Sequence, residues 1–314
     1  MITKLHIDAL VVSKAELYSS VEHFRNLDRE LFIHSIRQEI ESLVELMSPE
    51  VCIKRSEFFN LPGVVPNDYE ERILNVSEGL FILAGIRFQG LDVTQPFVSV
   101  LGNFKDIDLI PFDKIGELIK EEFKVFRPTC FHVSFPEEKG IPAHNFKIDR
   151  YTVMGNIQAI VEQKLKSIPD KVEIKVLNDM NFYDDYVREY DMLYKNSPQL
   201  KSEVKIESLE SLLEAASENL LFEVIINGKR AGVIAGYVEN YFGLNQVCIL
   251  EELLFEKYRG KGFGVYLQKA FAQKMHGRFE ILWGHISQLN PSSLKTALKN
   301  GRKITEIEYS FSLF

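Results

Sequence analysis

The front of the chain alternates between helical and strand-like spacing of hydrophobic residues. From Ser13 to Leu46 these residues recur every three or four positions, which is the spacing of one helix face. Ser48 and Pro49 are expected to end this stretch, because the residue before a proline avoids helical backbone angles. The pattern then predicts two strands, a helix with Asp113 as N-cap, a third strand and a short helix: Gly79–Phe88, Pro96–Leu101, Asp113–Phe126, Thr129–Phe135 and Gly155–Lys166.

The back of the chain has a clearer element order. Ser167–Asp170 is the expected domain boundary, which gives domains 1–166 and 170–314. Ser208 is expected to cap a helix, and Asn227-Gly228 to turn a β-hairpin. The predicted strands are Lys171–Leu177, Leu221–Asn227, Arg230–Val238, Gln246–Phe255, Phe279–Ile286 and Lys303–Leu313, and the helices are Asn181–Tyr194, Ser208–Ala216, Gly262–Met275 and Pro291–Asn300. This order predicts an α/β fold with a mixed sheet and helices on both faces.

Composition narrows the class of protein. The chain is 314 residues long, with 46% hydrophobic and 26% charged residues, which is ordinary for a globular protein and excludes a disordered one. Its net charge of −8 argues against a general nucleic-acid binder. The chain has no apolar run long enough to span a membrane and no signal peptide, so we expect a cytoplasmic protein without a membrane partner. Three widely spaced cysteines predict neither disulfides nor a metal site: Cys52, Cys130 and Cys248.

One glycine-rich segment, Tyr258–Gly264, carries the sharpest chemical signal. It follows an apolar strand and opens an amphipathic helix, where glycines let the backbone approach a ligand and the free N–H groups suit a phosphate. Lysine and arginine side chains add positive charge: Lys257, Arg259 and Lys261. A glycine-rich turn without a ligand is an equal alternative at this point. The spacing fits neither a dinucleotide-binding Rossmann loop nor a Walker A loop.

These residues resemble a known family. Arg259 to Gly264 matches the signature of the GNAT superfamily of acyl-CoA N-acyltransferases: Arg or Gln, two variable residues, Gly, a variable residue, and Gly or Ala. The order of elements agrees over residues 170–314. The segment from Asn290 to Gly301 is similar to the family's next helix, which usually begins with Asn and ends with Gly-Phe. The resemblance implies a GNAT-like mixed central sheet.

The resemblance also implies a coenzyme A site. In the family, backbone N–H groups of the signature hold the CoA pyrophosphate, which would involve Arg259, Gly260, Lys261, Gly262, Phe263 and Gly264. The end of the preceding strand pairs with the pantetheine after a bulge, which would involve Leu253, Leu254 and Phe255. Asn290 would contact the pantetheine arm, and Ser293, one turn further, either reaches the cofactor or faces solvent.

Two acids precede the signature. Transfer of an acyl group to an amine needs a base to take the amine proton, and the family often has an acid in this strand. Glu251 and Glu252 are the candidates, and Glu251 matches the family position better. Because successive strand residues point to opposite faces, only one should face the cleft unless a bulge intervenes. The alternative is a charged residue at a sheet end, paired with Lys257 or Arg259.

The chain departs from the family pattern at two positions. Ala297 replaces the tyrosine that often protonates the leaving thiolate, and Arg302 replaces the phenylalanine of Gly-Phe. Three other tyrosines are available, and the sequence singles out none of them: Tyr258, Tyr266 and Tyr309. The missing acid weakens the mechanism and favours a binding-only domain as the alternative.

Other residues suggest chemistry less strongly. The seven histidines form no known motif, and we expect Cys248 and Trp283 to lie in the core. The helix around Tyr186 carries several acids and tyrosines that either attract a cationic amine or form a solvated face. These residues are Asp184, Asp185, Glu189, Asp191, Tyr183, Tyr186 and Tyr190.

The front domain, residues 1–166, has no glycine-rich signature. Its strand, strand, helix and strand resemble the middle of the same fold, so it is either a diverged copy or an unrelated α+β domain. The segment Asp106–Asp113 lies where a cofactor loop would fall, with three acids and no glycine. Because that composition repels pyrophosphate, we expect no CoA site there.

The resulting hypothesis is an N-acyltransferase that uses acyl-CoA. Acetyl-CoA is the expected donor on family grounds, and a small-molecule or peptide amine is the expected acceptor, attacked directly in a ternary complex. The front domain would shape the acceptor cleft or a homodimer. Two other classes stay open: a non-catalytic CoA or acyl-CoA sensor, and a nucleotide-binding protein that uses the same loop.

Overall fold

The computed structural model describes residues 2–25, 27–137, 146–201, 204–239 and 242–314. The chain forms two compact units: Met1–Arg150 with Tyr241–Gly243 and Thr305–Phe314, and Tyr151–Asn240 with Leu244–Ile304. The first change of unit thus comes before the boundary expected at Ser167–Asp170. Its physical reason is that α5 (Ile157–Glu162) buries Ile157 and Ile160 in the core of the second unit. Most of the loop expected at 136–145 lies outside the described residues.

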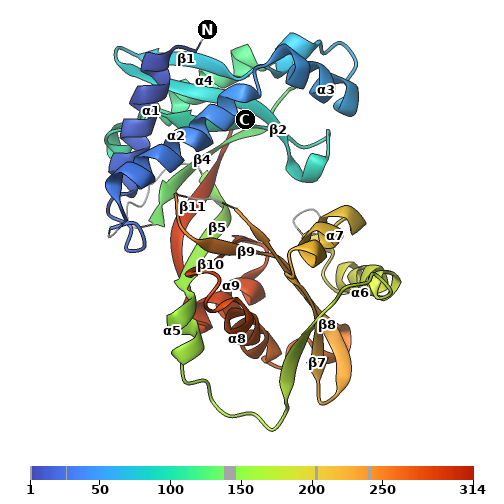
Figure 1. Cartoon of the computed structure of the whole chain (residues 1–314). Helices are drawn as coiled ribbons and strands as arrows, with labels where there is room; N and C mark the ends of the chain where they lie inside the picture. The colour runs from blue at the N-terminus through green and yellow to red at the C-terminus, as the bar shows by residue number, and fades with distance from the viewer. Residues whose placement is uncertain (1, 26, 138–145, 202–203, 240–241) are drawn as a thin grey trace. The chain divides into compact units, whose positions relative to one another are not determined.

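Three capped helices open the first unit (Figure 1): α1 (Lys4–Tyr18), α2 (Arg29–Glu45) and α3 (Pro49–Phe59). The side chains of Thr3, Asp28 and Ser48 accept hydrogen bonds from backbone N–H groups of their first turns. The helical stretch does end just before Ser48-Pro49, since α2 ends at Glu45, but the same pair also begins a further helix that was not predicted: Ser48 caps α3 and Pro49 takes its first position. A helix needs no N–H donor at that position.

The sheet of the first unit combines antiparallel and parallel pairs. β1 (Arg72–Ser77), β2 (Leu80–Phe88) and β3 (Pro96–Gly102) form an antiparallel meander. The chain then crosses through α4 (Phe112–Glu122) to β4 (Cys130–Pro136), which runs parallel to β3. β11 (Lys303–Ser312) pairs antiparallel with β4. Short 3-10 turns lie between these elements: Pro66–Tyr69, Gln89–Leu91 and Ile107–Leu109.

The predicted N-cap of α4 is wrong. Pro111 takes that position and offers no capping side chain. Asp113 lies instead in the first turn, where its carboxylate faces the positive end of the helix dipole. Two of the three acids of segment 106–113, Asp106 and Asp108, do lie between β3 and α4, as expected.

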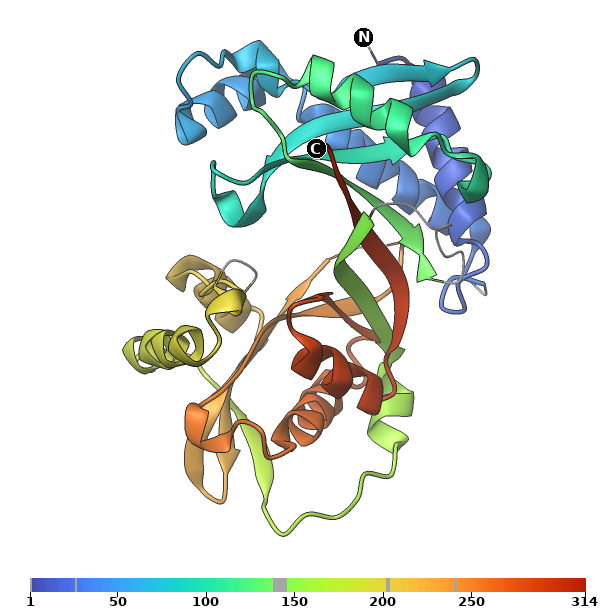
Figure 2. The same cartoon turned by 180° about the vertical axis from the view of Figure 1, so that it is seen from behind.

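Aromatic residues fill the core of the first unit. On the α4 face, the ring of Phe112 stacks on that of Phe311 at 4.3 Å between centroids. On the face covered by α1 and α2, Phe242 packs against Tyr18 and Phe32, at 5.1 and 5.4 Å. The unit therefore has helices on both faces of its sheet, as Figure 2 shows from behind.

The second unit has the mixed sheet that the element order predicts. β6 (Val172–Val176), β7 (Leu221–Ile226), β8 (Lys229–Val238) and β9 (Gln246–Leu254) are successive antiparallel neighbours. β10 (Ile281–Ser287) runs parallel to β9. The helices are α5, α6 (Tyr183–Asn196), α7 (Leu209–Ser217), α8 (Phe263–Met275) and α9 (Pro291–Lys299). Short turns follow α6 at Pro198–Leu200 and β9 at Glu256–Tyr258.

Local sequence signals explain several of these elements. Ser208 caps α7, with its hydroxyl accepting a hydrogen bond from Ser211 N at 3.0 Å. Asn227 and Gly228 both have positive φ, 50° and 75°, as the two-residue turn between β7 and β8 requires. Both predictions are confirmed.

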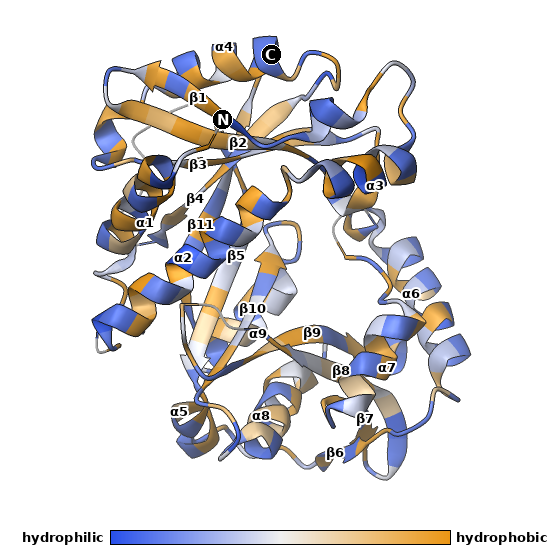
Figure 3. Ribbon diagram, turned by 45° about the horizontal axis from the view of Figure 1, so that its top comes forward, coloured by the Kyte–Doolittle hydropathy of each residue, from blue (hydrophilic) through white to orange (hydrophobic). Residues whose placement is uncertain are grey.

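The core of the second unit lies between its sheet and its helices. Figure 3 shows hydrophobic residues along β9 and hydrophilic ones on the outer faces of α6 and α7. Cys248 and Trp283 are both buried, as expected. In the described part of the chain, no helix combines the length and the apolar character needed to cross a bilayer.

Phe271 offers a test of this packing. Its ring is fully buried in α8 and lies edge-on to Phe222 of β7 at 5.8 Å. We expect Phe271→Ala to lower the free energy of unfolding by about 3–5 kcal/mol, because it leaves a cavity. Urea unfolding followed by the fluorescence of Trp283, the only tryptophan, measures this. Leu298→Ala, at a residue 43% exposed in α9, is the control and should change stability by less than about 0.5 kcal/mol.

Candidate active site

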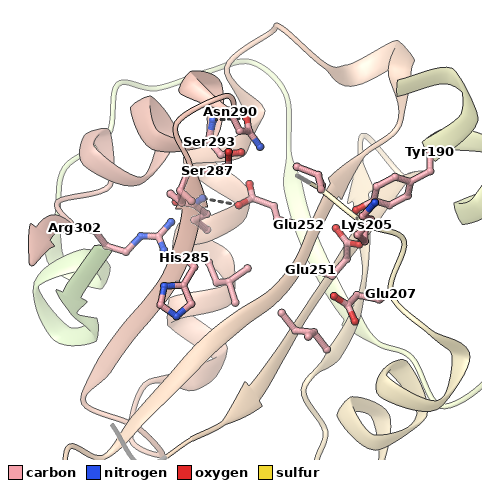
Figure 4. Close-up of a pocket in the computed structure, with 16 residues that line it drawn as sticks. Tyr190, Lys205, Glu207, Glu251, Glu252, His285, Ser287, Asn290, Ser293 and Arg302 are labelled. Carbon is pink, nitrogen blue, oxygen red and sulfur yellow. Dashed lines mark hydrogen bonds between the residues drawn. The ribbon is translucent and has the colours of Figure 1, made fainter. Parts of the chain in front are cut away.

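A cleft opens where β9 and β10 part. The two strands pair from Gln246 with Ile281 to Cys248 with Trp283, and pairing ends there. Beyond that point Ile249 to Glu252 line one wall and Gly284 to Ser287 the other, around a cavity of about 230 Å³ (Figure 4). On its other side β9 pairs with β8 as far as Leu254. The edge of β9 that faces the cleft therefore has unpaired backbone groups, which suit an extended ligand that contains amides.

A bulge in β9 brings both acids to the cleft. The register against β8 shifts between Ala235–Glu251 and Gly236–Ile249, which leaves Leu250 as the extra residue. Glu251 and Glu252 still point to opposite faces, toward α6 and α8, yet both line the cavity. The expectation of one cleft-facing acid held only for a strand without a bulge. The bulge is present, and both acids line the cavity.

Glu251 is the acid with the more perturbed environment. It is 5% exposed, and its Oε2 accepts hydrogen bonds from the hydroxyls of Tyr186 and Tyr190, the latter at 2.7 Å. Burial raises the pKa of Glu251 to about 7, although the two tyrosine hydroxyls oppose the rise; the nearby Glu207 charge adds to it. A carboxyl with a pKa near neutrality can both take and return a proton.

Glu252, unlike Glu251, contacts α8. Its Oε2 accepts a hydrogen bond from Gln268 Nε2 of α8 at 2.5 Å. A Cβ built on Gly264 would lie 3.3 Å from Glu252 Oε1, so this glycine lets α8 approach the strand closely. Burial raises the pKa of Glu252, while Gln268 and the charge of Arg302 lower it. Glu252 therefore ties the cleft wall to the helix that follows the glycine loop.

The glycine loop presents an uncapped helix N-terminus. Gly260 and Gly262 have φ of 73° and 81°, in the left-handed region that favours glycine. Gly262 precedes α8 and offers no side chain to cap it, so the first N–H groups of the helix are free to bind an anion. Lys261 is exposed, whereas Phe263 is buried and anchors the helix.

Arg259 of the signature is engaged within the protein. Its Nε donates to Leu254 O at 2.6 Å, and its Nη2 donates to the backbone oxygen of Glu189 at 3.0 Å. It also forms an ion pair with the Glu189 carboxylate at 3.3 Å. The side chain therefore fixes the loop to β9 and α6, which leaves ligand binding to the backbone groups of this segment.

The helix α9 borders the other side of the cleft. Asn290 caps it, with Oδ1 accepting a hydrogen bond from Ser293 N at 3.2 Å, and both residues line the cavity. Ser293 is half-buried, so it is not the fully solvated helix residue that the alternative prediction described. Ala297 is fully buried against Val153 and Ile286. Leu253 and Leu254 end β9 and Phe255 follows them toward the loop, and none of the three lines the cavity.

Several residues of the cleft were not predicted from sequence. Arg302, His285 and Gln268 line it, and the tyrosine that lines it is Tyr190. None of Tyr258, Tyr266 and Tyr309 lines the cavity; Tyr309 lies in the core of the first unit. The sequence did contain a signal for Tyr190. Tyrosines recur every four residues in α6, at Tyr186, Tyr190 and Tyr194, which places them on one face of the helix.

The acids of α6 form a partly solvated surface, and they are engaged with cations of the chain. Asp185 pairs with Arg188 and with Arg230, the latter at 3.9 Å, and Glu189 pairs with Arg259. Asp184 and Asp191 are exposed. The buried residues of this helix are Tyr186 and Tyr190, which turn toward Glu251. The solvated face expected for this helix is therefore present at Asp184 and Asp191 but not at Tyr186 and Tyr190.

The first unit also contains a polar cluster. His132 Nδ1 lies 3.3 Å from Glu308 Oε1, and Arg150 Nε lies 2.8 Å from the same oxygen. Asp149 completes a group whose ligand-type atoms all lie within 4.8 Å of one another. Although burial lowers the pKa of His132, contacts with Cys130 and Glu308 raise it to about 9. The protonated His132 and Arg150 thus both contact the Glu308 carboxylate and lower its pKa, whereas burial raises the pKa of Asp149.

No family model matches the sequence of the chain. No curated protein matches its sequence either. Among solved structures, the chain is similar to a GNAT-family N-acetyltransferase from Sphaerobacter thermophilus, at 9% identity over 87% of this chain and 93% of that chain, with a TM-score of 0.48. It is also similar to a Drosophila protein, at 13% identity over 99% and 97%, with a TM-score of 0.45. A GNAT acetyltransferase from Colwellia psychrerythraea matches at 12% identity over 82% and 94%, with a TM-score of 0.43.

The environment of Glu251 predicts a dependence of stability on pH. The pKa of its carboxyl is about 7 in the folded protein against an ordinary value of 4.5, so the folded state holds the proton more tightly. Stability from this group is present at low pH and is lost as pH rises from about 4.5 through about 7, by about 3 kcal/mol in all. We expect Glu251→Gln to remove this loss.

Urea unfolding at pH 5 and pH 8 measures the effect. Glu189→Gln, at a partly exposed acid of α6, is the matched control and should keep the wild-type difference between the two pH values. An equal difference in wild type and Glu251→Gln would contradict the assignment of the raised pKa to Glu251.

Proposed function

We propose that the protein is an N-acyltransferase that uses acyl-CoA, with its working site in the second unit. One observation carries the proposal. A cleft lies between parted parallel strands with a carboxyl of near-neutral pKa in its wall, and the strand that forms this wall leads to a glycine loop at an uncapped helix N-terminus. Each part corresponds to a part of the thioester donor or to a step of the reaction.

The glycine loop would hold the pyrophosphate of CoA. The N–H groups at the start of α8 point out of the helix end, and the helix dipole adds a partial positive charge there. Gly260 and Gly262 have nothing within 4 Å of the position of a Cβ, so the surface above them is open to a ligand. Lys261, exposed beside them, adds charge. Because Arg259 is already engaged, its contribution is to hold the loop in place.

The open edge of β9 would take the pantetheine arm. The arm contains two amides, which can pair with unpaired backbone groups as an added strand does. The strand from Ile249 to Leu254 has such an edge, and Leu253 to Phe255 lie at its end next to the loop. Asn290 and Ser293 face the same cavity from α9, with the Asn290 amide nitrogen as a donor beyond its capping oxygen.

Glu251 would act as the base. The amine nitrogen attacks the thioester carbonyl, the C–N bond forms and the C–S bond breaks, and sulfur leaves as a thiolate that takes a proton from solvent. The proton of the attacking amine passes to Glu251, directly or through water. Backbone N–H groups on the open edge of β9 are the donors available for the developing oxyanion. With Ala297 buried in the core, no tyrosine from α9 protonates the thiolate.

A second candidate function is a sensor that binds acyl-CoA without turnover. It is favoured by Ala297 and by the hydrogen bonds that already engage Glu251 with two tyrosines. Steady release of thiol from acetyl-CoA with a panel of amines separates the two, because a sensor binds the thioester and releases none.

The first unit would be a diverged copy that has lost its donor site. In both units an antiparallel pair is followed by a helix that crosses to a parallel strand: β2, β3, α4 and β4 in one, β8, β9, α8 and β10 in the other. In the first unit the acidic segment 106–113 replaces the glycine loop, and the ring of Phe104 lies against Gly102 at the end of β3. Charge and steric bulk both exclude a pyrophosphate-bearing ligand there.

Titration calorimetry with CoA tests the site. We expect one CoA per chain, and we expect Gly262→Ala to weaken binding at least about tenfold, since its methyl group would occupy the ligand's surface. Gly277→Ala is a matched control: its φ of 83° imposes the same backbone strain, and its Cβ also meets nothing within 4 Å. Two CoA molecules per chain would contradict the loss of the first site, and no binding would contradict the proposed function.

The pH dependence of the rate tests the base. We expect Glu251→Gln to lower kcat about 10²–10⁴-fold. In the wild type, kcat/KM should rise with pH to a plateau above about 7. Tyr190→Phe removes a donor to the carboxylate, so the pKa of Glu251 and the midpoint of the profile should move to higher pH. Tyr194→Phe is the control, because its hydroxyl donates to Val204 O instead. Wild-type rates in Glu251→Gln and Glu252→Gln together would remove the base assignment.

A further inference from the structure

A buried arginine lies at the inner end of the cleft. Arg302 follows α9 and is only 3% exposed, yet its side chain lines the cavity (Figure 4). Two glycines lie beside it, and Gly155 makes room for it. A Cβ on Gly155 would lie 2.8 Å from Arg302 Cγ, and a Cβ on Gly284 would lie 3.8 Å from Arg302 Nη1. Gly284 directly follows Trp283, where the pairing of β9 and β10 ends. The guanidinium is thus held at the point where the strands part.

The guanidinium has hydrogen-bonding capacity that the protein leaves unused. Among the residues that the structure describes, none accepts a hydrogen bond from Arg302 Nε. The charge of Glu252 acts on Arg302, but Gln268 holds that carboxylate, and among the described residues the two side chains form no direct ion pair. Burial lowers the pKa of Arg302 to about 10, so the side chain stays protonated at neutral pH.

An unpaired buried cation is costly to keep. Removing a charge from water without a hydrogen-bonded partner destabilises a protein by several kcal/mol, so such charges are normally paired. An apolar residue would fill this core position without that penalty, and phenylalanine is what the family resemblance leads us to expect here. A guanidinium that faces a cleft with free donors is the geometry that binds a carboxylate with two hydrogen bonds.

We propose that Arg302 binds a carboxylate at the far end of the acyl group, so that the donor is the CoA thioester of a short dicarboxylic acid. The inference rests on the proposed function, because it places the thioester beside β9 with its acyl group directed toward the point where the strands part. The carboxylate is not consumed, and the transfer to the amine is balanced as described above. Gly284 leaves the approach to the guanidinium free of a side chain.

The same chemistry could come from a second source. A carboxylate on the amine acceptor, as in a free amino acid, also matches a guanidinium in the cleft. We assign it to the acyl group because Arg302 lies at the inner, closed end of the parted strands. An acceptor that enters from solvent would reach the exposed His285 first.

Calorimetry with three ligands tests the assignment without knowledge of the acceptor. CoA, butyryl-CoA and succinyl-CoA share the nucleotide and pantetheine, and the last two differ in a terminal methyl or carboxylate. In the wild type we expect succinyl-CoA to bind at least about tenfold more tightly than butyryl-CoA. In Arg302→Met we expect this order to be lost or reversed, with the affinity for CoA itself unchanged. Arg302→Lys should keep part of the preference, because lysine retains the charge without the bidentate geometry.

The outcomes separate the two proposals. If CoA itself does not bind, the proposed function fails. If CoA binds and the wild type prefers butyryl-CoA or binds both acyl thioesters equally, the assignment of Arg302 is overturned, even if the variants do not fold. If acetyl-CoA supports transfer to an amino acid better than to its amide, and only Arg302→Met loses that difference, the carboxylate belongs to the acceptor and the acyl assignment is again overturned.

Discussion

The end of pairing between β9 and β10 is the constraint on which the candidate site depends. Parallel strands normally continue their hydrogen bonds to the end of the shorter strand, but here pairing stops at Cys248 and Trp283. The bulge at Leu250 lies just beyond that point. It increases the local twist of β9, which turns the strand away from its neighbour while its pairing with β8 continues. Free backbone groups, two acids and a buried arginine thereby reach one cavity.

The polar groups of this cavity are arranged on the two faces of the sheet. On one face two tyrosines of α6 surround Glu251, and on the other Gln268 holds Glu252 near Arg302. The two carboxyls are adjacent in sequence but lie in separate environments. Burial raises the pKa of Glu251 to near neutrality against the lowering effect of its two hydroxyl donors, whereas Gln268 and the charge of Arg302 oppose the rise at Glu252. Alternation along a strand therefore gives two neighbouring acids different chemistry.

The sequence predicted local features of this protein better than long-range ones. Turn and cap residues act within a few positions, so Asn227-Gly228, Ser208 and the glycines of the loop could be assigned directly. Ser48-Pro49 was predicted only as the end of a helical stretch, whereas the pair also begins α3. Two strands, β1 and β5 (Phe146–Asn156), were not predicted as strands. The contacts of Glu251 with α6 and the position of Arg302 join residues far apart in the chain, and no local pattern encodes them.

The position of the last strand has a consequence for the folding of the protein during its synthesis. Residues 305–314 belong to the first unit, where β11 pairs with β4 along most of its length. During synthesis the ribosome delivers nearly the whole chain before that strand exists. Until then β4 keeps an unpaired edge, with Phe131 and Phe135 lacking the aromatic partners Phe311 and Tyr309. The first unit is therefore synthesised first but completes its sheet last. A chain truncated by a few residues at its C-terminus would leave the sheet of that unit incomplete.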